Sequence, residues 1–330
     1  MSSRALTIGA IATAVALNAF PDAPAAAQEW PTRPVTMVVP YAAGGAIDVI
    51  GRILGPHLSE ILRQQVIIEN VGGAGGMIGA DRVAKAAPDG YQFVFGNLGT
   101  HAQNQTLYKQ PRYNAATDFA PVALVAEQPF VLIARKDFPA DNLQGFAAYT
   151  RANQGKLQYG SAGAGSGVHL ACALLNKAIG VDVTHVAYRG GGPAMQDLIA
   201  GRIDYQCPNA SAAIPHIESK LVKAIAIMSK SRSQILPSLA SAQEQGIKDF
   251  DVENWAAFFL PKGTPAAVVR KMNEATVAVM NRPAVQQRLR ELGAEVVAPE
   301  RRSPEYLRQF VESEIRKWAE TIKASGLAIN

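Results

Sequence analysis

Short apolar runs alternate with amphipathic stretches along the first third of the chain. Residues 35–39 form a β-rich run, and residues 47–64 then place isoleucine and leucine at helical spacing. A second β-rich run at 66–69, a helical stretch at 77–86 and a third β-rich run at 92–95 continue the alternation. This β-α-β-α-β order predicts an α/β fold with parallel strand pairing and right-handed crossovers.

The middle third repeats this alternation, and the last third is mostly helical. Thr-Pro at 264–265 and Ser-Pro at 303–304 each place a capping residue before a proline, which is the pattern of a helix start. We expect the first of these helices to end near Met280 and the second near Gly326. Further strands are expected at 130–134, 157–159, 183–188, 203–207, 223–228 and 295–297, and further helices at 143–152, 168–179 and 193–200.

The first 27 residues have the pattern of a secretory signal. Arg4 gives a positive start, residues 5–19 form a small apolar stretch, and three alanines ending at Ala27 precede the expected cleavage site. The apolar stretch is shorter than the roughly 18 residues that a membrane-spanning helix requires. We therefore expect an exported protein whose signal is removed after Ala27, with no membrane anchor.

The length of the chain indicates its number of domains, and its charge distribution restricts the kinds of partner it can bind. The chain has 330 residues, more than one hydrophobic core usually holds, which favours two domains. The net charge is +5, but lysine and arginine are scattered, and no basic segment carries interleaved aromatic residues. Since a nucleic-acid interface requires a concentrated basic patch, we expect no nucleic-acid partner.

The two cysteines, Cys172 and Cys207, leave two alternatives open. Export permits a disulfide bond between them. Two cysteines in so long a chain are equally compatible with small buried apolar residues, and the sequence does not show whether their Cα atoms come close.

Enzyme motifs are absent from the glycine-rich segments. Ile78 and Val168 stand where a dinucleotide fingerprint needs its third glycine, and no phosphate-binding P-loop occurs. Ser161 and Ser166 lack the flanking glycines of a nucleophile elbow. The five histidines show no metal-ligand spacing. We therefore expect no enzymatic activity, no catalytic residues, no cofactor and no metal.

Three glycine-rich turns, at 43–45, 160–167 and 190–192, each follow an expected strand and precede an expected helix. The N–H groups at a helix start lack partners, and the helix dipole adds positive potential there, so such turns suit anions. One turn of this kind usually just closes a tight bend. Three of them, at the strand ends where α/β proteins bind ligands, favour a carboxylate-binding site.

Side chains near these turns have two interpretations each. Asp48, in the first turn of a helix, is either a dipole-favoured acid or an acceptor for a ligand group. Tyr41 and Tyr188 end strands and either wall a pocket or pack in the core. His101 is similarly open, and His169 at a helix start fits a packing or capping role better.

These motifs, in the order in which they follow along the chain, resemble those of a known protein family. The chain is similar to the Bug-type extracytoplasmic solute receptors, the substrate-binding components of tripartite tricarboxylate transporters. The similarity spans essentially the whole chain after the signal. It is carried by segments 30–34, 40–48, 69–76, 87–91, 99–101, 118–122, 159–163 with 165–166, 169–170, 185–194, 197–198 with Gly201, 261–265 and 292–295.

The resemblance implies a periplasmic, two-lobed binding-protein fold of the second type, each lobe a mostly parallel sheet flanked by helices. Lobe 1 would comprise residues 28–127 and 252–330, and lobe 2 residues 128–251, with hinges at the two crossings. The ligand would be a small mono-, di- or tricarboxylate, aliphatic or aromatic, held in the cleft. Partners would be a large and a small integral membrane subunit, and the receptor would be a monomer.

The resemblance also implies a set of ligand contacts. Asn209 lies in the segment 205–209, which departs from the family pattern, and its side chain could also face the cleft. The runner-up functions on the same scaffold are an exported hydrolase and a ligand sensor for a membrane signalling protein. The implied contacts are Tyr41, Ala43, Gly44, Asp48, Thr100, His101, Ser161, Gly163, Ser166, Tyr188 and Gly191.

Overall fold

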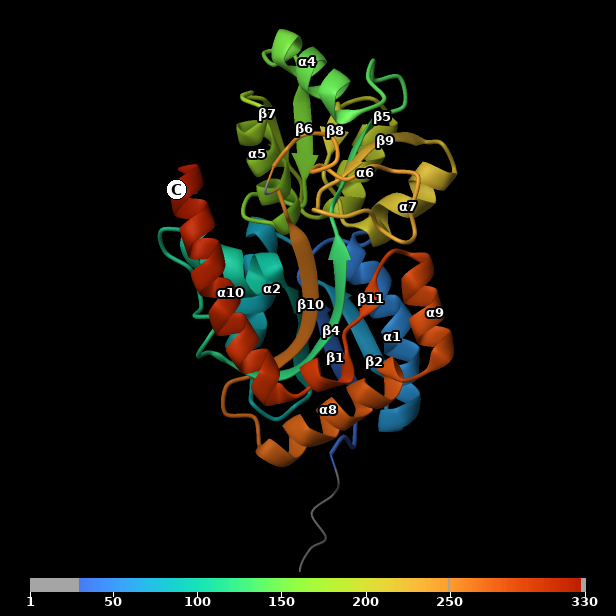
Figure 1. Ribbon diagram of the computed structural model, residues 1–330. Helices are drawn as coiled ribbons and strands as arrows, with labels where there is room; N and C mark the ends of the chain where they lie inside the picture. The colour runs from blue at the N-terminus through green and yellow to red at the C-terminus, as the bar shows by residue number, and fades with distance from the viewer. Residues whose placement is uncertain (1–29, 249, 328–330) are drawn as a thin grey trace, which may run out of the picture.

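The computed structural model describes residues 30–248 and 250–327 (Figure 1). The expected signal sequence and its cleavage after Ala27 lie outside the described residues. The structure contains two β-sheets, each flanked by helices, which confirms the α/β class. We call the part built on the six-stranded sheet lobe 1 and the part built on the five-stranded sheet lobe 2.

Lobe 1 combines strands from both ends of the chain. Its sheet has the order β11-β4-β10-β3-β1-β2. The strands are β1 (Val35–Val39), β2 (Val66–Asn70), β3 (Gln92–Asn97), β4 (Phe119–Pro129), β10 (Glu253–Pro261) and β11 (Glu295–Val296). The flanking helices are α1 (Ala46–Leu62), α2 (Met77–Ala84), α3 (Asn104–Leu107), α8 (Ala266–Met280), α9 (Pro283–Glu291) and α10 (Pro304–Ser325).

Lobe 2 is formed by the middle of the chain. Its sheet has the order β7-β6-β8-β5-β9. The strands are β5 (Val131–Arg135), β6 (Gln158–Ser161), β7 (Thr184–Ala187), β8 (Tyr205–Gln206) and β9 (Val222–Ile227). The helices are α4 (Leu143–Asn153), α5 (Gly167–Ala178), α6 (Gly191–Ile199) and α7 (Ala210–Glu218).

Both sheets are mixed, so the expectation of mostly parallel sheets is wrong. Among the named strands of the described residues, parallel pairing is confined to β1 with β2 and β3, and to β6 with β7 and β8. The other pairs, including β4 with β10, are antiparallel. The physical reason is that β4 carries the chain toward lobe 2 and β10 brings it back, so the two strands run in opposite directions.

The connection between the lobes is a continuous two-stranded ribbon. β4 and β10 pair from Pro261 with Phe119 to Glu253 with Pro129, and Figure 1 shows them side by side along the length of lobe 1. Only Phe130 separates β4 from β5, the strand that enters the second sheet. The expected lobe boundaries, after Glu127 and after Asp251, stay a prediction; the first falls inside β4.

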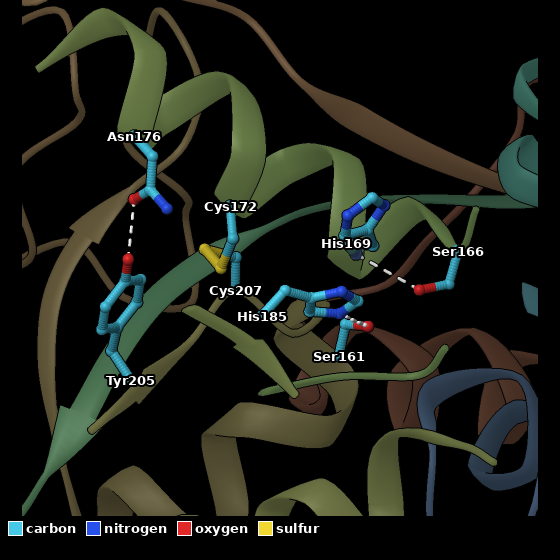
Figure 2. The surroundings of a disulfide bond; sticks show 8 residues. All are labelled: Ser161, Ser166, His169, Cys172, Asn176, His185, Tyr205 and Cys207. Atoms are coloured by element: carbon cyan, nitrogen blue, oxygen red, sulfur yellow. Dashed lines mark hydrogen bonds between the residues drawn. A yellow bond between two sulfur atoms is a disulfide. The ribbon is translucent and has the colours of Figure 1, made fainter. Parts of the chain in front are cut away.

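Aromatic packing and one covalent bond stabilise the buried residues, whose main cluster runs through both lobes. In lobe 1 the ring centroid of Phe258 lies 5.1 Å from that of Phe93 and 4.7 Å from that of Phe95, and all three side chains are fully buried. In lobe 2 Cys172 on α5 forms a disulfide with Cys207, just after β8, which settles the two alternatives (Figure 2). Among the described residues, none of the helices combines the length and apolarity needed to cross a bilayer.

Candidate functional site

A cavity lies between the lobes, at the carboxyl ends of β1, β3 and β6. About 440 Å³ of its volume is not filled by protein atoms, a figure that includes open solvent at its mouth. Lobe 1 contributes Tyr41, Gly45, Ala46, Ile47, Asn97 and Asn254. Lobe 2 contributes Ala162, Ser166, Gly167, Val168, Gly191, Pro208, Asn209 and Ala212.

Four helices start at this cavity: α1, α5, α6 and α7. The N-cap residues of α1, α6 and α7 form no side-chain capping hydrogen bond. The first N–H groups of α1 and α6 are therefore left for other acceptors, whereas at α7 the N–H of Ser211 already donates to Oε1 of Gln128 (3.2 Å). On α5 the Ser166 hydroxyl accepts the N–H of His169, which leaves the N–H groups of Gly167 and Val168. None of the described residues that line the cavity is an aspartate, glutamate, lysine, arginine or histidine. The site is therefore positive through its main chain and helix dipoles alone.

Asp48 supports the start of α1 from behind. Its carboxylate accepts the N–H of Gly44 (3.0 Å), Nε of Arg52 (2.9 Å) and Nδ2 of Asn70 (2.9 Å). Burial favours the protonated acid, but these hydrogen bonds, led by that of Arg52, outweigh burial and hold the pKa of Asp48 below its usual range. Asp48 does not line the cavity, so its arrangement fixes the glycine turn.

Thr100 and His101 lie behind the lobe 1 wall. Tyr41 Oη donates to Oδ1 of Asn97 (3.1 Å), and that oxygen also accepts the N–H of Thr100 (3.2 Å). Thr100 Oγ1 lies 2.9 Å from Nδ1 of His101, whose ring stacks on Phe259 at 3.8 Å. Complete burial lowers the pKa of His101 to about 3, so this ring is neutral. These residues orient Tyr41 and Asn97, which do line the cavity.

The lobe 2 turn is held by neutral groups. Ser161 Oγ lies 2.6 Å from Nε2 of His185 and accepts the N–H of Gly163 (3.1 Å). The rings of His169 and His185 are 4.2 Å apart, and Figure 2 shows both next to Ser161 and Ser166. Burial lowers the pKa of His185 to about 4. The Ser161–His185 distance suits a nucleophile and its base, but Ser161 is fully buried outside the cavity lining.

The lobes also touch beside the cavity, mostly through main-chain atoms and partly through the Tyr108 side chain. Ala42 N–H donates to the carbonyl of Arg189 (3.1 Å), and Tyr108 Oη donates to the carbonyl of Ala164 (2.7 Å). A Cβ at Gly192 would overlap the carbonyl oxygen of Ala43 across this contact. We call these contacts the glycine seam, because segments 42–45 and 72–76 of lobe 1 meet segments 189–192 and 163–165 of lobe 2.

The expected contact residues occupy three kinds of position. Those lining the cavity are Tyr41, Ser166, Gly191 and Asn209. Those in the seam or in the turns behind the lining are Ala43, Gly44, Asp48, Gly163 and Ser161. Thr100 and His101 lie deeper, and Tyr188 is turned toward Asp197, to which its hydroxyl donates. Whether each contacts a ligand stays a prediction.

Sequence reasoning missed several lining residues. Ala46, Ile47 and Val168 follow two of the recognised turns directly and Gly167 is the last residue of one of them, so extending the site by the first helical residues would have found all four. Asn254 carried no signal, because the strand that holds it was not expected. Among residues 30–248 and 250–327 there is no cluster of three or more metal-ligating side chains.

Comparisons with known proteins agree on one family. Residues 50–327 match the model of the tripartite tricarboxylate transporter family receptor. A curated Agrobacterium vitis protein, named for the TAR-I ttuE-ttuC' intergenic region, is 37% identical over 316 residues, covering 96% of this chain and 91% of that one. The periplasmic binding protein BugD superposes with a TM-score of 0.88 at 39% identity, over 91% and 99% of the two chains. MatC from Rhodopseudomonas palustris, solved with bound malate, superposes with a TM-score of 0.86 at 40% identity, covering 89% of this chain and 100% of that one.

Proposed function

The chain belongs to the tripartite tricarboxylate transporter receptor family, and from that membership we propose that it captures a small organic carboxylate between its lobes and delivers it to a membrane transporter. The family consists of periplasmic solute receptors and is not an enzyme family. The receptor would act in the periplasm after losing its signal, as a monomer. A large and a small integral membrane subunit would receive its ligand, and it needs no cofactor and no nucleic acid.

The observation that carries this proposal is the meeting of four helix starts at a cavity without charged side chains. Main-chain N–H groups that donate to a carboxylate form charge-assisted bonds, roughly twice as strong as neutral ones. An uncharged solute would lose that advantage. A cavity of this kind therefore selects a small anion, and the malate bound to the similar MatC supports a carboxylate.

Both lobes supply donors, which links binding to closure. The N–H groups of Ala46 and Ile47 come from lobe 1, and those of Gly167 and Val168 come from lobe 2. A ligand that bridges them binds the closed form better than an open one, and this difference in affinity drives closure. The closed receptor would then be the form that the membrane subunits recognise.

A thermal-shift screen over organic carboxylates tests the proposal. The purified protein is first unfolded and refolded to remove carried-over ligand. A carboxylate present at about 100 times its Kd should add roughly 2.7 kcal/mol to the free energy of unfolding. Recovery of the ligand unchanged after equimolar incubation is expected of a receptor and contradicts the hydrolase alternative. A flat response to mono-, di- and tricarboxylates would contradict the proposed function.

A further inference from the structure

Two asparagine side chains from different lobes meet in the cavity. Nδ2 of Asn254, on β10, donates to Oδ1 of Asn209, the N-cap of α7, at 3.2 Å. Both residues are buried, with 1% and 5% of their surface exposed. Their other amide atoms, Nδ2 of Asn209 and Oδ1 of Asn254, are buried without a hydrogen-bond partner among the described residues. The pair thus carries one unused donor and one unused acceptor.

Local structure does not explain either asparagine. Asparagine is favoured at an N-cap because its oxygen accepts an N–H of the first helical turn, but Asn209 forms no such bond. Asn254 lies within a strand, where asparagine is depleted. A buried polar atom without a partner destabilises the folded protein, because the hydrogen bond it made to water is not replaced. Two such atoms facing one cavity therefore point to a ligand group that satisfies both.

The chemistry of that group follows from the amides. An amide pair that shares one hydrogen bond keeps one NH₂ and one C=O free, and this holds equally if both amides are rotated by 180°. A carboxylate only accepts hydrogen bonds, so it would leave the carbonyl of the pair unsatisfied, and an alkyl group would leave both. A hydroxyl donates and accepts through a single atom, which suits a narrow cavity.

We propose that Asn209 and Asn254 form a hydroxyl subsite, so that the receptor prefers hydroxylated carboxylates over carboxylates of the same charge and length that lack the hydroxyl. This inference rests on the proposed function, because the carboxylate is held by the helix starts and the hydroxyl by the asparagine pair. Asn254 belongs to lobe 1 and Asn209 to lobe 2, so the hydroxyl would also bridge the lobes.

Calorimetric titration with matched acids tests the subsite. Malate is compared with succinate, and lactate with propionate, since each pair differs by one hydroxyl. At least one hydroxylated acid should bind about tenfold or more tightly than its partner, because the unmatched amide atoms are penalised when the hydroxyl is missing. In Asn254→Leu the hydroxylated acid should lose that advantage, while the affinity for the plain acid changes by less than about threefold.

Two further variants complete the test. Asn209→Ala removes the other amide at a position where no capping bond is lost, so it covers the case that Asn254→Leu does not fold. Asn153→Ala is the control, because its amide donates to the carbonyl of Tyr149 at the end of α4, outside the cavity lining. It should leave both affinities unchanged.

The outcomes separate the two proposals. Tight binding of plain and hydroxylated acids with equal affinity overturns the subsite and leaves the proposed function standing. Equal losses for both acids in Asn209→Ala and Asn254→Leu also overturn it, since the pair would then act only on the structure. If no carboxylate binds the wild-type protein, the proposed function falls and the subsite with it.

Discussion

The two helix starts that face each other across the cavity perform the same task with different supports. At α1 the N-cap is Gly45, and a charged group, Asp48 with Arg52, holds the turn from behind. At α5 the N-cap is Ser166, and a neutral Ser161–His185 pair holds the turn. A disulfide further anchors α5 to the segment after β8. What the two starts share is free N–H groups, and in both cases charge is kept out of the cavity lining.

The largest expected effect concerns the covalent support, which only lobe 2 has. The disulfide joins residues that are 35 positions apart, so replacing both cysteines by alanine should lower the free energy of unfolding by about 3–4 kcal/mol. Urea unfolding measures this loss. Hydrogen exchange should become faster in α5 and stay unchanged in α1. Dithiothreitol should destabilise the wild type but not the double variant, and equal unfolding midpoints would contradict the prediction.

The next effect tests the seam that brings the two helix starts together. In Gly192→Ala the new Cβ would overlap the Ala43 carbonyl, whereas at Gly191 its nearest contact is the Cα of Gly45 at 3.6 Å. We expect Gly192→Ala to weaken carboxylate binding by about 10- to 100-fold, or about 1.4–2.7 kcal/mol, and Gly191→Ala by less than about threefold. Calorimetric titration measures both affinities.

Stability distinguishes a closure defect from a folding defect in these variants. Both glycines lie in the first turn of α6, where alanine is the better helix former by up to about 1 kcal/mol. The Gly192→Ala variant should therefore not unfold at a lower denaturant concentration than the wild type. A variant that binds as tightly as the wild type would show that the seam does not control closure.

The neutral support of lobe 2 should respond to mild acid. His185 is half-buried and its pKa lies at about 4, below the roughly 6.5 of an unfolded histidine. Between pH 4 and 6.5 the unfolded chain binds more protons at His185 than the folded chain does. The contribution of neutral His185 to the free energy of unfolding is therefore fully present above pH 6.5 and is lost as the pH falls toward 4. His185→Gln should reduce the pH dependence of unfolding in this window. Burial also lowers the pKa values of His101 and His169, so part of the pH dependence of unfolding should remain in this variant. An unchanged slope in His185→Gln would contradict the assignment.

The charged support of lobe 1 should give the smallest effect. Arg52 is 55% exposed, so the loss of its ion pair should itself contribute only about 0.5–1 kcal/mol to the stability change in Asp48→Asn. The pKa of Asp48 is lowered, so its contribution persists above its unfolded pKa near 3.8 and is lost as pH falls below that value. Carboxylate affinity should fall about two- to fivefold, or about 0.4–1 kcal/mol. A loss beyond about tenfold would instead indicate direct contact with the ligand.

Sequence patterns predicted the parallel βα units well. The first strand, expected at 35–39, is β1, and the helix expected at 47–64 is α1, two residues shorter at its end. Those units are punctuated by glycine turns, which mark where a strand stops and a helix begins. The final helix was also predicted to within one residue of its end at Ser325.

The ribbon of β4 and β10 was not predicted. Phe258, Phe259 and their neighbours in β10 are buried on both faces, so the strand shows no alternation of apolar and polar residues. The turns of the site could be found from glycines, because its donors belong to the main chain. Asn254 could not, because its place in the cavity depends on β10 pairing with β4 across the chain.

The most direct test of the central claim removes a single main-chain donor. Ala46 is the first residue of α1, where proline is well tolerated, and Gly45 before it has the extended backbone that proline requires. Ala46→Pro should therefore fold normally but bind carboxylate about 10- to 100-fold more weakly, because one charge-assisted bond is lost. Ala266→Pro, at the exposed start of α8, is the matched control. Calorimetric titration that finds the wild-type affinity in a folded Ala46→Pro would contradict a grip by helix N–H groups.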